Sequence, residues 1–66
     1  MTDSDLDTYF PRATPAQRLA IQVYHDAGWT VEPMLPNDNS VEIHRATYYD
    51  TVDICFILPN GSVVPL

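Results

Sequence analysis

The sequence predicts an α+β fold in which one main helix packs on an antiparallel sheet of three or four strands. Three patterns lead to this prediction. A capped segment with helical periodicity covers residues 15–27, the apolar residues then follow a period of two, and an Asn-Gly pair at 60–61 lies between two apolar runs. Because a chain of 66 residues supports only one small hydrophobic core, we expect residues 1–66 to form a single domain.

Residues 1–11 are an acidic segment for which we predict at most a short helical turn. Ser4 would cap this turn, and aspartates after it would lie near the positive end of the helix. Leu6, Tyr9 and Phe10 have the spacing of one helix face and would hold the turn on the core. The alternative is a frayed tail.

The main helix is predicted from Thr14, which has proline at the first helical position and glutamine at the third, as in a capping box. The helical period runs over residues 15–27, and Gly28 stands where a left-handed residue ends a helix. Trp29 would pack back on Tyr24, as in a Schellman motif.

The apolar residues of this helix predict which side meets the sheet. At about 100° per residue, one side carries most of the apolar residues. That side comprises Ala16, Leu19, Ala20, Val23, Tyr24 and Ala27. Ile21 lies at its flank, and Arg18, Gln22 and His25 lie opposite. We therefore expect the first group to face the core.

Four segments with strand-like patterns follow the helix and form the predicted sheet. They are residues 29–34, 41–47, 51–58 and 62–66. In the second segment, alternation assigns Val41 and Ile43 to the inward face and Glu42 and His44 to the outward face. The last strand belongs at an edge, because Pro65 cannot donate a hydrogen bond to a neighbouring strand.

The Asn-Gly pair at 60–61 predicts a hairpin with a two-residue loop of type I′. Such a loop would place Leu58 opposite Val63 and Ile57 opposite Val64. The inward face of the third strand would then carry Val52, Ile54, Phe56 and Leu58.

The other face of this hairpin is also apolar, although a solvated sheet face normally carries polar residues. The residues predicted on it, which are our candidates for self-association, are Cys55, Ile57, Val64 and Leu66. The N-terminal segment, a second copy of the chain or a partner would have to cover them.

Nine acidic side chains oppose three arginines, and the absence of lysine leaves a formal net charge of −6 at pH 7. We expect no direct binding to nucleic acid, because such binding depends on Lys and Arg displacing counterions from phosphates. A surface this negative attracts basic protein surfaces instead. Hydrophobic residues make up 45% of the chain, which is enough for a core and argues against disorder.

Seven residues are candidates for contact with a basic partner. Carboxylates on neighbouring strands can form an array of negative charge with a spacing like that of nucleic-acid phosphates, and loop tyrosines are typical of binding hot spots. The candidates are Glu32, Asp38, Glu42, Tyr48, Tyr49, Asp50 and Asp53. The alternatives are that the acids serve solubility or adaptation to high salt, and that one tyrosine packs into the core.

The sequence contains no catalytic, metal-binding or cofactor motif. His25, His44 and Cys55 lack the spacing of zinc ligands, and the aspartates at the start lack the glycine and glutamate of a calcium loop. A Cys55–His44–Asp53 group can be drawn across adjacent strands, but a thiol at an apolar strand centre is hidden. We therefore predict that the chain is no enzyme and uses no cofactor or metal.

Location and function are expected from the same features. A single cysteine excludes an internal disulfide, the acidic start is unlike a signal peptide, and no apolar run is long enough to span a membrane, so we expect a cytoplasmic protein. In size, acidity and lack of catalytic residues the chain resembles phage-encoded inhibitors, among them anti-CRISPR proteins. This resemblance is one of composition, and it implies an inhibitor that mimics nucleic acid in the host cytoplasm. The alternative is a small structural or regulatory module that dimerises through its apolar C-terminal hairpin or adds a strand to another sheet.

Overall fold

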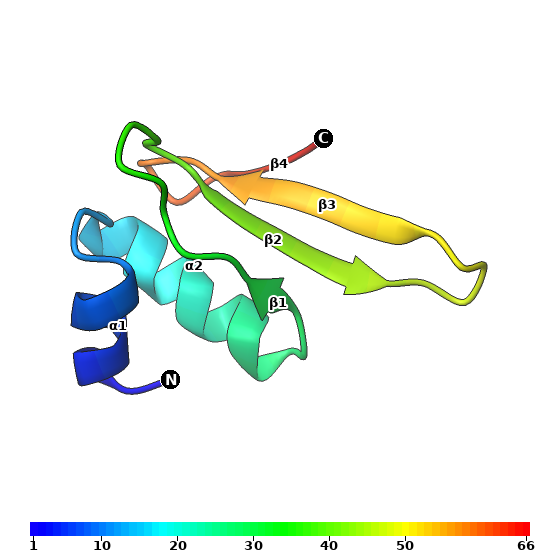
Figure 1. Ribbon diagram of the computed structural model, residues 1–66, viewed down its shortest axis with the longest axis horizontal. Helices are drawn as coiled ribbons and strands as arrows, with labels where there is room; N and C mark the ends of the chain where they lie inside the picture. Colours follow the sequence, from blue (N-terminus) through cyan, green and yellow to red (C-terminus); the bar gives the residue numbers. More distant parts are fainter.

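A computed structural model describes residues 1–66 and has two helices packed on a four-stranded antiparallel sheet (Figure 1). The elements are α1 (Asp3–Tyr9), α2 (Pro15–Asp26), β1 (Thr30–Val31), β2 (Val41–Ala46), β3 (Val52–Ile57) and β4 (Val63–Pro65). The strands lie in the sheet in their sequence order, β1-β2-β3-β4. The predicted α+β class is confirmed, and each strand is shorter than predicted, β1 most of all. Neither helix has the length and apolar character that a membrane span requires.

The short helix α1 is capped by Thr2, two residues before the predicted cap Ser4, and the cap is a capping box. The Thr2 hydroxyl accepts a hydrogen bond from the Asp5 backbone N–H at 3.2 Å, and the Asp5 carboxylate accepts one from the Thr2 backbone N–H at 3.1 Å. Ser4, the predicted cap, lies inside the helix. Its third following residue, Asp7, is bound to Arg18 of α2 instead and is not free to complete a box.

The ends of α2 form as the local sequence predicts. Thr14 and Gln17 make the reciprocal capping box, with hydrogen bonds of 3.1 and 2.9 Å. At the other end Gly28 has a φ of +93°, and the Trp29 backbone N–H donates to the Tyr24 carbonyl at 3.0 Å. The Trp29 ring packs edge-on against the Tyr24 ring at 5.4 Å, as a Schellman motif predicts.

The side of α2 that meets the sheet differs from the predicted one. Ile21 and Gln17 are wholly buried, whereas Leu19 and Val23 are 72% and 61% exposed. The Gln17 amide explains the rotation, because its Nε2 donates to the Ile57 carbonyl at 3.1 Å in the interior. Without this contact the Ile57 carbonyl would be buried with one partner fewer, at a cost of about 1–3 kcal/mol, which is comparable to the gain from burying one apolar side chain, so the polar contact helps to set the helix orientation.

The β3–β4 hairpin has a three-residue loop rather than the predicted two-residue loop. The Gly61 N–H donates to the Leu58 carbonyl and the Leu58 N–H donates to the Ser62 carbonyl, each at 2.8 Å. A type I′ turn needs positive φ at two residues, but here only Gly61 has it, at +86°. Pro59, whose ring fixes φ near −65°, favours a type I turn followed by a left-handed glycine.

This loop shifts the register by one residue, and a one-residue shift exchanges the two faces of a strand. Ile57 pairs with Val63 and Phe56 with Val64. Ile57 is wholly buried in the core, and Cys55 packs against it. Both were predicted on the uncovered face, and that prediction is wrong. The face turned away from α2 instead carries Val52, Ile54, Phe56, Val64 and Leu66.

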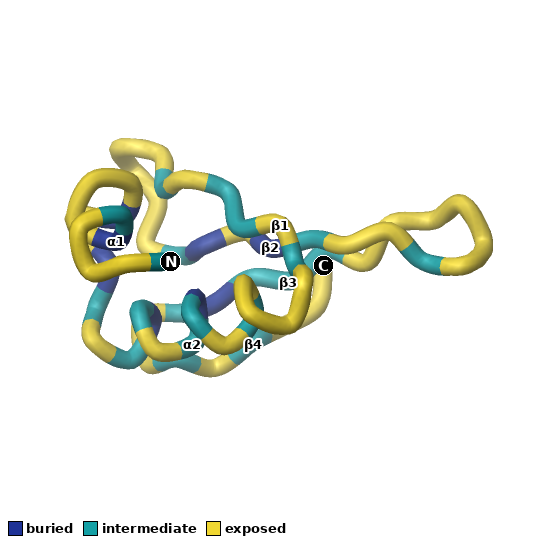
Figure 2. Tube along the Cα trace, turned by 90° about the horizontal axis from the view of Figure 1, so that it is seen from below, coloured by how far each residue is buried: buried dark blue, intermediate teal, exposed yellow.

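The core lies at one end of the molecule, between the helices and one face of the sheet (Figure 2). Its buried apolar residues are Leu6, Phe10, Ala13, Ile21, Val41, Ile43 and Ile57. The N-terminal segment is therefore part of this layer, because Leu6 and Phe10 are 6% and 1% exposed, and it does not cover the outward face. Tyr9, the third predicted anchor, is 53% exposed. Beyond the core, the β2–β3 hairpin projects past the helices as an arm (Figures 1 and 2).

Candidate functional site

The end of the β2–β3 arm is a tight connection that presents two tyrosines to solvent. The Thr47 backbone N–H donates to the Thr51 carbonyl at 2.9 Å, and the two hydroxyls are in contact. Between them, Tyr48 and Tyr49 are 102% and 86% exposed. The alternative that one of these rings packs into the core is therefore wrong.

Asp50 completes this tip in a left-handed conformation, with a φ of +56°. Aspartate tolerates this conformation better than most residues with a side chain, because its short polar group can bind locally. Asp50 makes no ion pair, and it follows the two exposed tyrosines directly in the chain. The hairpin tip, residues 48–50, is thus aromatic and negative.

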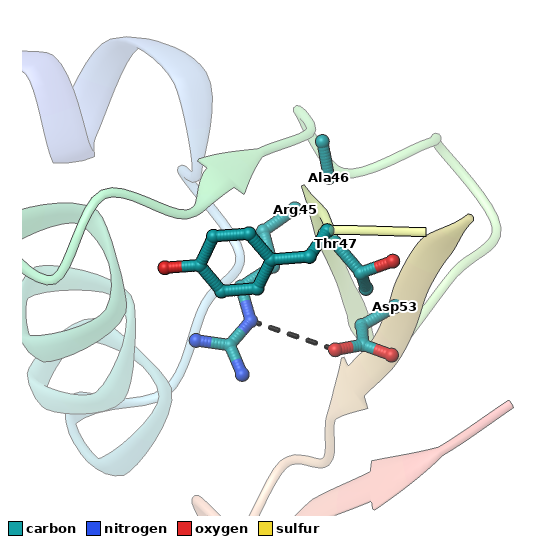
Figure 3. A pocket seen from close by; sticks show the side chains of 5 residues that line it. Arg45, Ala46, Thr47 and Asp53 are labelled. Carbon is teal, nitrogen blue, oxygen red and sulfur yellow. Dashed lines mark ion pairs between the residues drawn. The ribbon is translucent and has the colours of Figure 1, made fainter. Parts of the chain in front are cut away.

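On the helix-facing side of the arm, a hollow of about 410 Å³ lies beside the tip (Figure 3). Arg45 and Asp53 face each other across β2 and β3, with Nε and Oδ2 3.6 Å apart. The Arg45 guanidinium also lies 4.5 Å from the centre of the Trp29 ring. Asp53 therefore contributes a partly compensated charge to this hollow.

Three other acids lie together at the other end of the sheet. Glu32, Asp38 and Glu42 line a hollow of about 240 Å³ that Phe56 also borders. The Glu32 backbone N–H donates to the Glu42 carbonyl at 2.9 Å, which places the two residues opposite each other on adjacent strands. We call these three residues the acidic patch.

The seven predicted contact residues thus form two groups and not one array. The acidic patch is one group, and the hairpin tip with Asp53 is the other. Asp53 pairs with Arg45 on the helix-facing side, whereas Glu42 pairs with Phe56 on the outward side. A single sheet face carrying all the strand carboxylates is therefore ruled out.

Each of the three arginines has a hydrogen-bond or ion-pair partner within the chain. Arg12 donates to the carbonyls of Leu35 and Asp38, the second at 2.8 Å. Arg18 binds Asp7 at 2.5 Å, and Arg45 contacts Asp53 on β3 and the Trp29 ring before β1. Five of the nine acids make no ion pair, namely Asp3, Asp5, Asp38, Glu42 and Asp50. The negative charge of the surface is therefore largely uncompensated.

His44 was not predicted as a metal ligand, because it lacks a standard ligand spacing in the sequence, but the structure places it beside two carboxylates. Its Nε2 lies 2.8 Å from Oε1 of Glu32, and possible ligand atoms of Glu32, Glu42 and His44 all lie within 4.8 Å of one another. The alternation of Glu42 and His44 on one face was visible in the sequence. The position of Glu32 beside them depends on the pairing of β1 with β2, which no local pattern specifies.

The thiol is separated from the groups that could activate it. Cys55 pairs with Ile43 on the helix-facing side, whereas His44 pairs with Ile54 on the outward side. The Cys55–His44–Asp53 group considered from the sequence therefore does not assemble.

The outward face of β3 and β4 has exposed apolar residues that neither helix covers. Val52, Val64 and Leu66 are 55%, 36% and 82% exposed. Of the four predicted self-association residues, only Val64 and Leu66 lie on this face.

No protein-family model matches the chain, and no curated protein sequence or solved structure is significantly similar to it. Function is therefore inferred from the geometry of these surfaces.

Proposed function

We propose that the chain is a non-enzymatic interaction protein that occupies a basic, nucleic-acid-binding surface of another protein and blocks it. The main support is the hairpin tip, where Tyr48 and Tyr49 expose almost their entire side chains. Folding gains nothing from two adjacent aromatic rings in water, whereas exposed tyrosines of this kind are enriched at binding hot spots.

The chemistry of the tip matches what such a surface binds. Proteins that bind single-stranded nucleic acid use Lys and Arg for phosphates and planar side chains for the bases. On the chain, the Asp50 carboxylate would stand in for a phosphate, and the rings of Tyr48 and Tyr49 would stand in for bases. The acidic patch and the net charge of −6 would speed the approach to a basic partner. The inhibitor would act in the cytoplasm, that of the host if a phage encodes it.

Affinity capture with matched tyrosine variants tests this function. The immobilised chain is exposed to lysate of the cells in which it acts, and the affinity of each retained protein is then measured with purified components. We expect Tyr48→Ala/Tyr49→Ala to weaken binding at least tenfold, roughly the loss of one hot spot. Tyr9→Ala is the control, because Tyr9 is exposed but lies on α1, and we expect a change of less than about twofold.

The same partner distinguishes charge from aromatic contact. Association should slow steeply between about 50 and 500 mM salt, because screening shortens the range of charge attraction. Asp50→Asn with Glu42→Gln should slow association more than Asp3→Asn with Asp26→Asn. Binding that ignores both salt and the tyrosine variants would contradict the proposal.

A second candidate function is supported by the exposed apolar face of β3 and β4, which could hold a second copy of the chain. A dimer would bury Val64 and Leu66, which are 36% and 82% exposed. Sedimentation over a range of concentrations would then show a dimer that Val64→Lys disrupts. A monomer at all concentrations would eliminate this candidate.

A further inference from the structure

We propose that Glu32, Glu42 and His44 form a site for a divalent transition metal, with zinc as the preferred ion. The three side chains offer one imidazole nitrogen and two carboxylate oxygens, and these atoms lie within 4.8 Å of one another. The site shares Glu32 and Glu42 with the acidic patch but includes no residue of the hairpin tip, so zinc binding can be tested separately from the tyrosine contacts of the proposed inhibitor.

The pairing of β1 with β2 builds the site. Thr30 pairs with His44, and the Glu32 N–H donates to the Glu42 carbonyl at 2.9 Å one step further along the ladder. Residues 42 and 44 point to the same side of β2, because side chains alternate along a strand. All three ligand side chains therefore leave the sheet on its outward face, and backbone hydrogen bonds fix their spacing.

The negative charges of the two glutamates favour binding of a cation at this site. Glu32 and Glu42 are directly opposite each other, and like charges in that position destabilise a sheet. Arg45 cannot relieve this repulsion, because it lies on the helix-facing side with Asp53. His44 contacts Glu32, but the Glu42 carboxylate has no hydrogen bond or ion pair. A divalent ion bound by all three groups would neutralise both carboxylates.

The donor set selects the type of ion. Imidazole nitrogen together with carboxylate oxygen suits zinc, cobalt and nickel, whereas magnesium and calcium prefer oxygen ligands alone. Bonds of about 2.0–2.2 Å in a tetrahedron place ligand atoms roughly 3.3–3.6 Å apart. The side chains would reach that spacing by rotamer changes, for which the exposed Glu42 has room. Three protein ligands leave the fourth position for water or for a ligand from another molecule.

Metal titration of the intact chain tests the site. Zinc binding is measured by calorimetry, and cobalt is used as a spectroscopic probe because its visible absorption reports tetrahedral coordination. We expect one ion per chain, and we expect His44→Ala and Glu42→Gln each to weaken binding at least tenfold, which is about 1.4 kcal/mol. His25→Ala is the matched control, because His25 is the other histidine and its ion pair is with Asp26 on α2, at 3.6 Å, outside the proposed site. It should bind zinc as the wild type does.

Further variants separate loss of metal binding from loss of folding. Circular dichroism of each variant establishes that it folds, and Cys55→Ser should retain full zinc affinity, because the thiol faces the core. Glu42→Gln separates a metal site from a simple His44–Glu32 ion pair, since only a metal site needs Glu42. The proposal is overturned if the wild type binds no zinc at about 100 µM, or if folded His44→Ala and Glu42→Gln bind as well as the wild type. It is also overturned if magnesium binds as tightly as zinc.

Discussion

At the scale of single residues, the buried amide of Gln17 links three parts of the fold. Its Nε2 donates to the carbonyls of Asn39 and Ile57 at 2.7 and 3.1 Å, and its Oε1 accepts from the Thr14 N–H at 2.9 Å. The side chain is 1% exposed, so water cannot replace these bonds. Gln17 therefore fixes the start of α2 on the end of β3.

Replacing this residue should destabilise the protein strongly. Gln17→Leu keeps the volume but removes the partners of the two carbonyls, and each unsatisfied buried group costs about 1–3 kcal/mol. We expect a loss of about 2–4 kcal/mol in the free energy of unfolding, measured by denaturant titration. Gln22→Leu, whose amide contacts only Asp26 near the surface, should change stability by less than about 0.5 kcal/mol. Equal losses would mean that Gln17 acts through packing alone.

The capping box of α1 predicts an effect of pH. The pKa of Asp5 is held below its ordinary value of 3.8, first by the hydrogen bond from the Thr2 backbone N–H and then by the Thr2 side chain. Because folding lowers this pKa, the ionised carboxylate stabilises the folded state at pH values above 3.8. This stabilisation is lost as the pH falls through the pKa of the folded state. Asp5→Asn should therefore lower the Tm at pH 6 and make little difference near pH 2, to be checked by thermal melts at both pH values. A constant difference in Tm would show that the carboxylate charge plays no part.

At the scale of elements, the sequence predicted what depends on neighbours along the chain. The capping box of Thr14 and the Schellman motif at Gly28 join residues within five positions of each other, and both were predicted correctly. The orientation of α2 was not, because the partners of Gln17 lie 22 and 40 residues away. The register of the last hairpin failed for a local reason, since Pro59 favours a longer loop than Asn-Gly alone.

The two glycines offer a test of this hairpin. Gly61 and Gly28 have similar φ values, +86° and +93°, so a Cβ strains the backbone similarly at both. A Cβ on Gly61 would also lie 3.1 Å from the Ala16 Cβ and 3.2 Å from the Ala16 oxygen, whereas nothing lies within 4 Å at Gly28. We expect Gly61→Ala to lose about 1 kcal/mol more stability than Gly28→Ala in chemical unfolding. Equal losses would contradict the close approach of the hairpin loop to α2.

At the scale of the whole molecule, the core and the candidate contact surface lie at opposite ends. The core packs the helices on one half of the sheet, and the β2–β3 arm projects beyond it (Figures 1 and 2). Tyr48 and Tyr49 lie in the connection at the end of this arm and are exposed. The sequence correctly placed these two tyrosines in the connection between the second and third strands, because the place of a loop along the chain does not depend on strand register. The division of the acids between two faces could not be predicted, because strand periodicity assigns a face only once the pairing is known.

The proposed inhibition is tested most directly by competition on a captured partner. A fluorescent oligonucleotide is bound to the partner, and its anisotropy is followed while the chain is added. We predict that the chain releases the oligonucleotide completely, that Tyr48→Ala/Tyr49→Ala needs at least about tenfold more protein, and that Tyr9→Ala behaves as the wild type. A ternary complex, in which the oligonucleotide stays bound while the chain binds as well, would contradict the proposal.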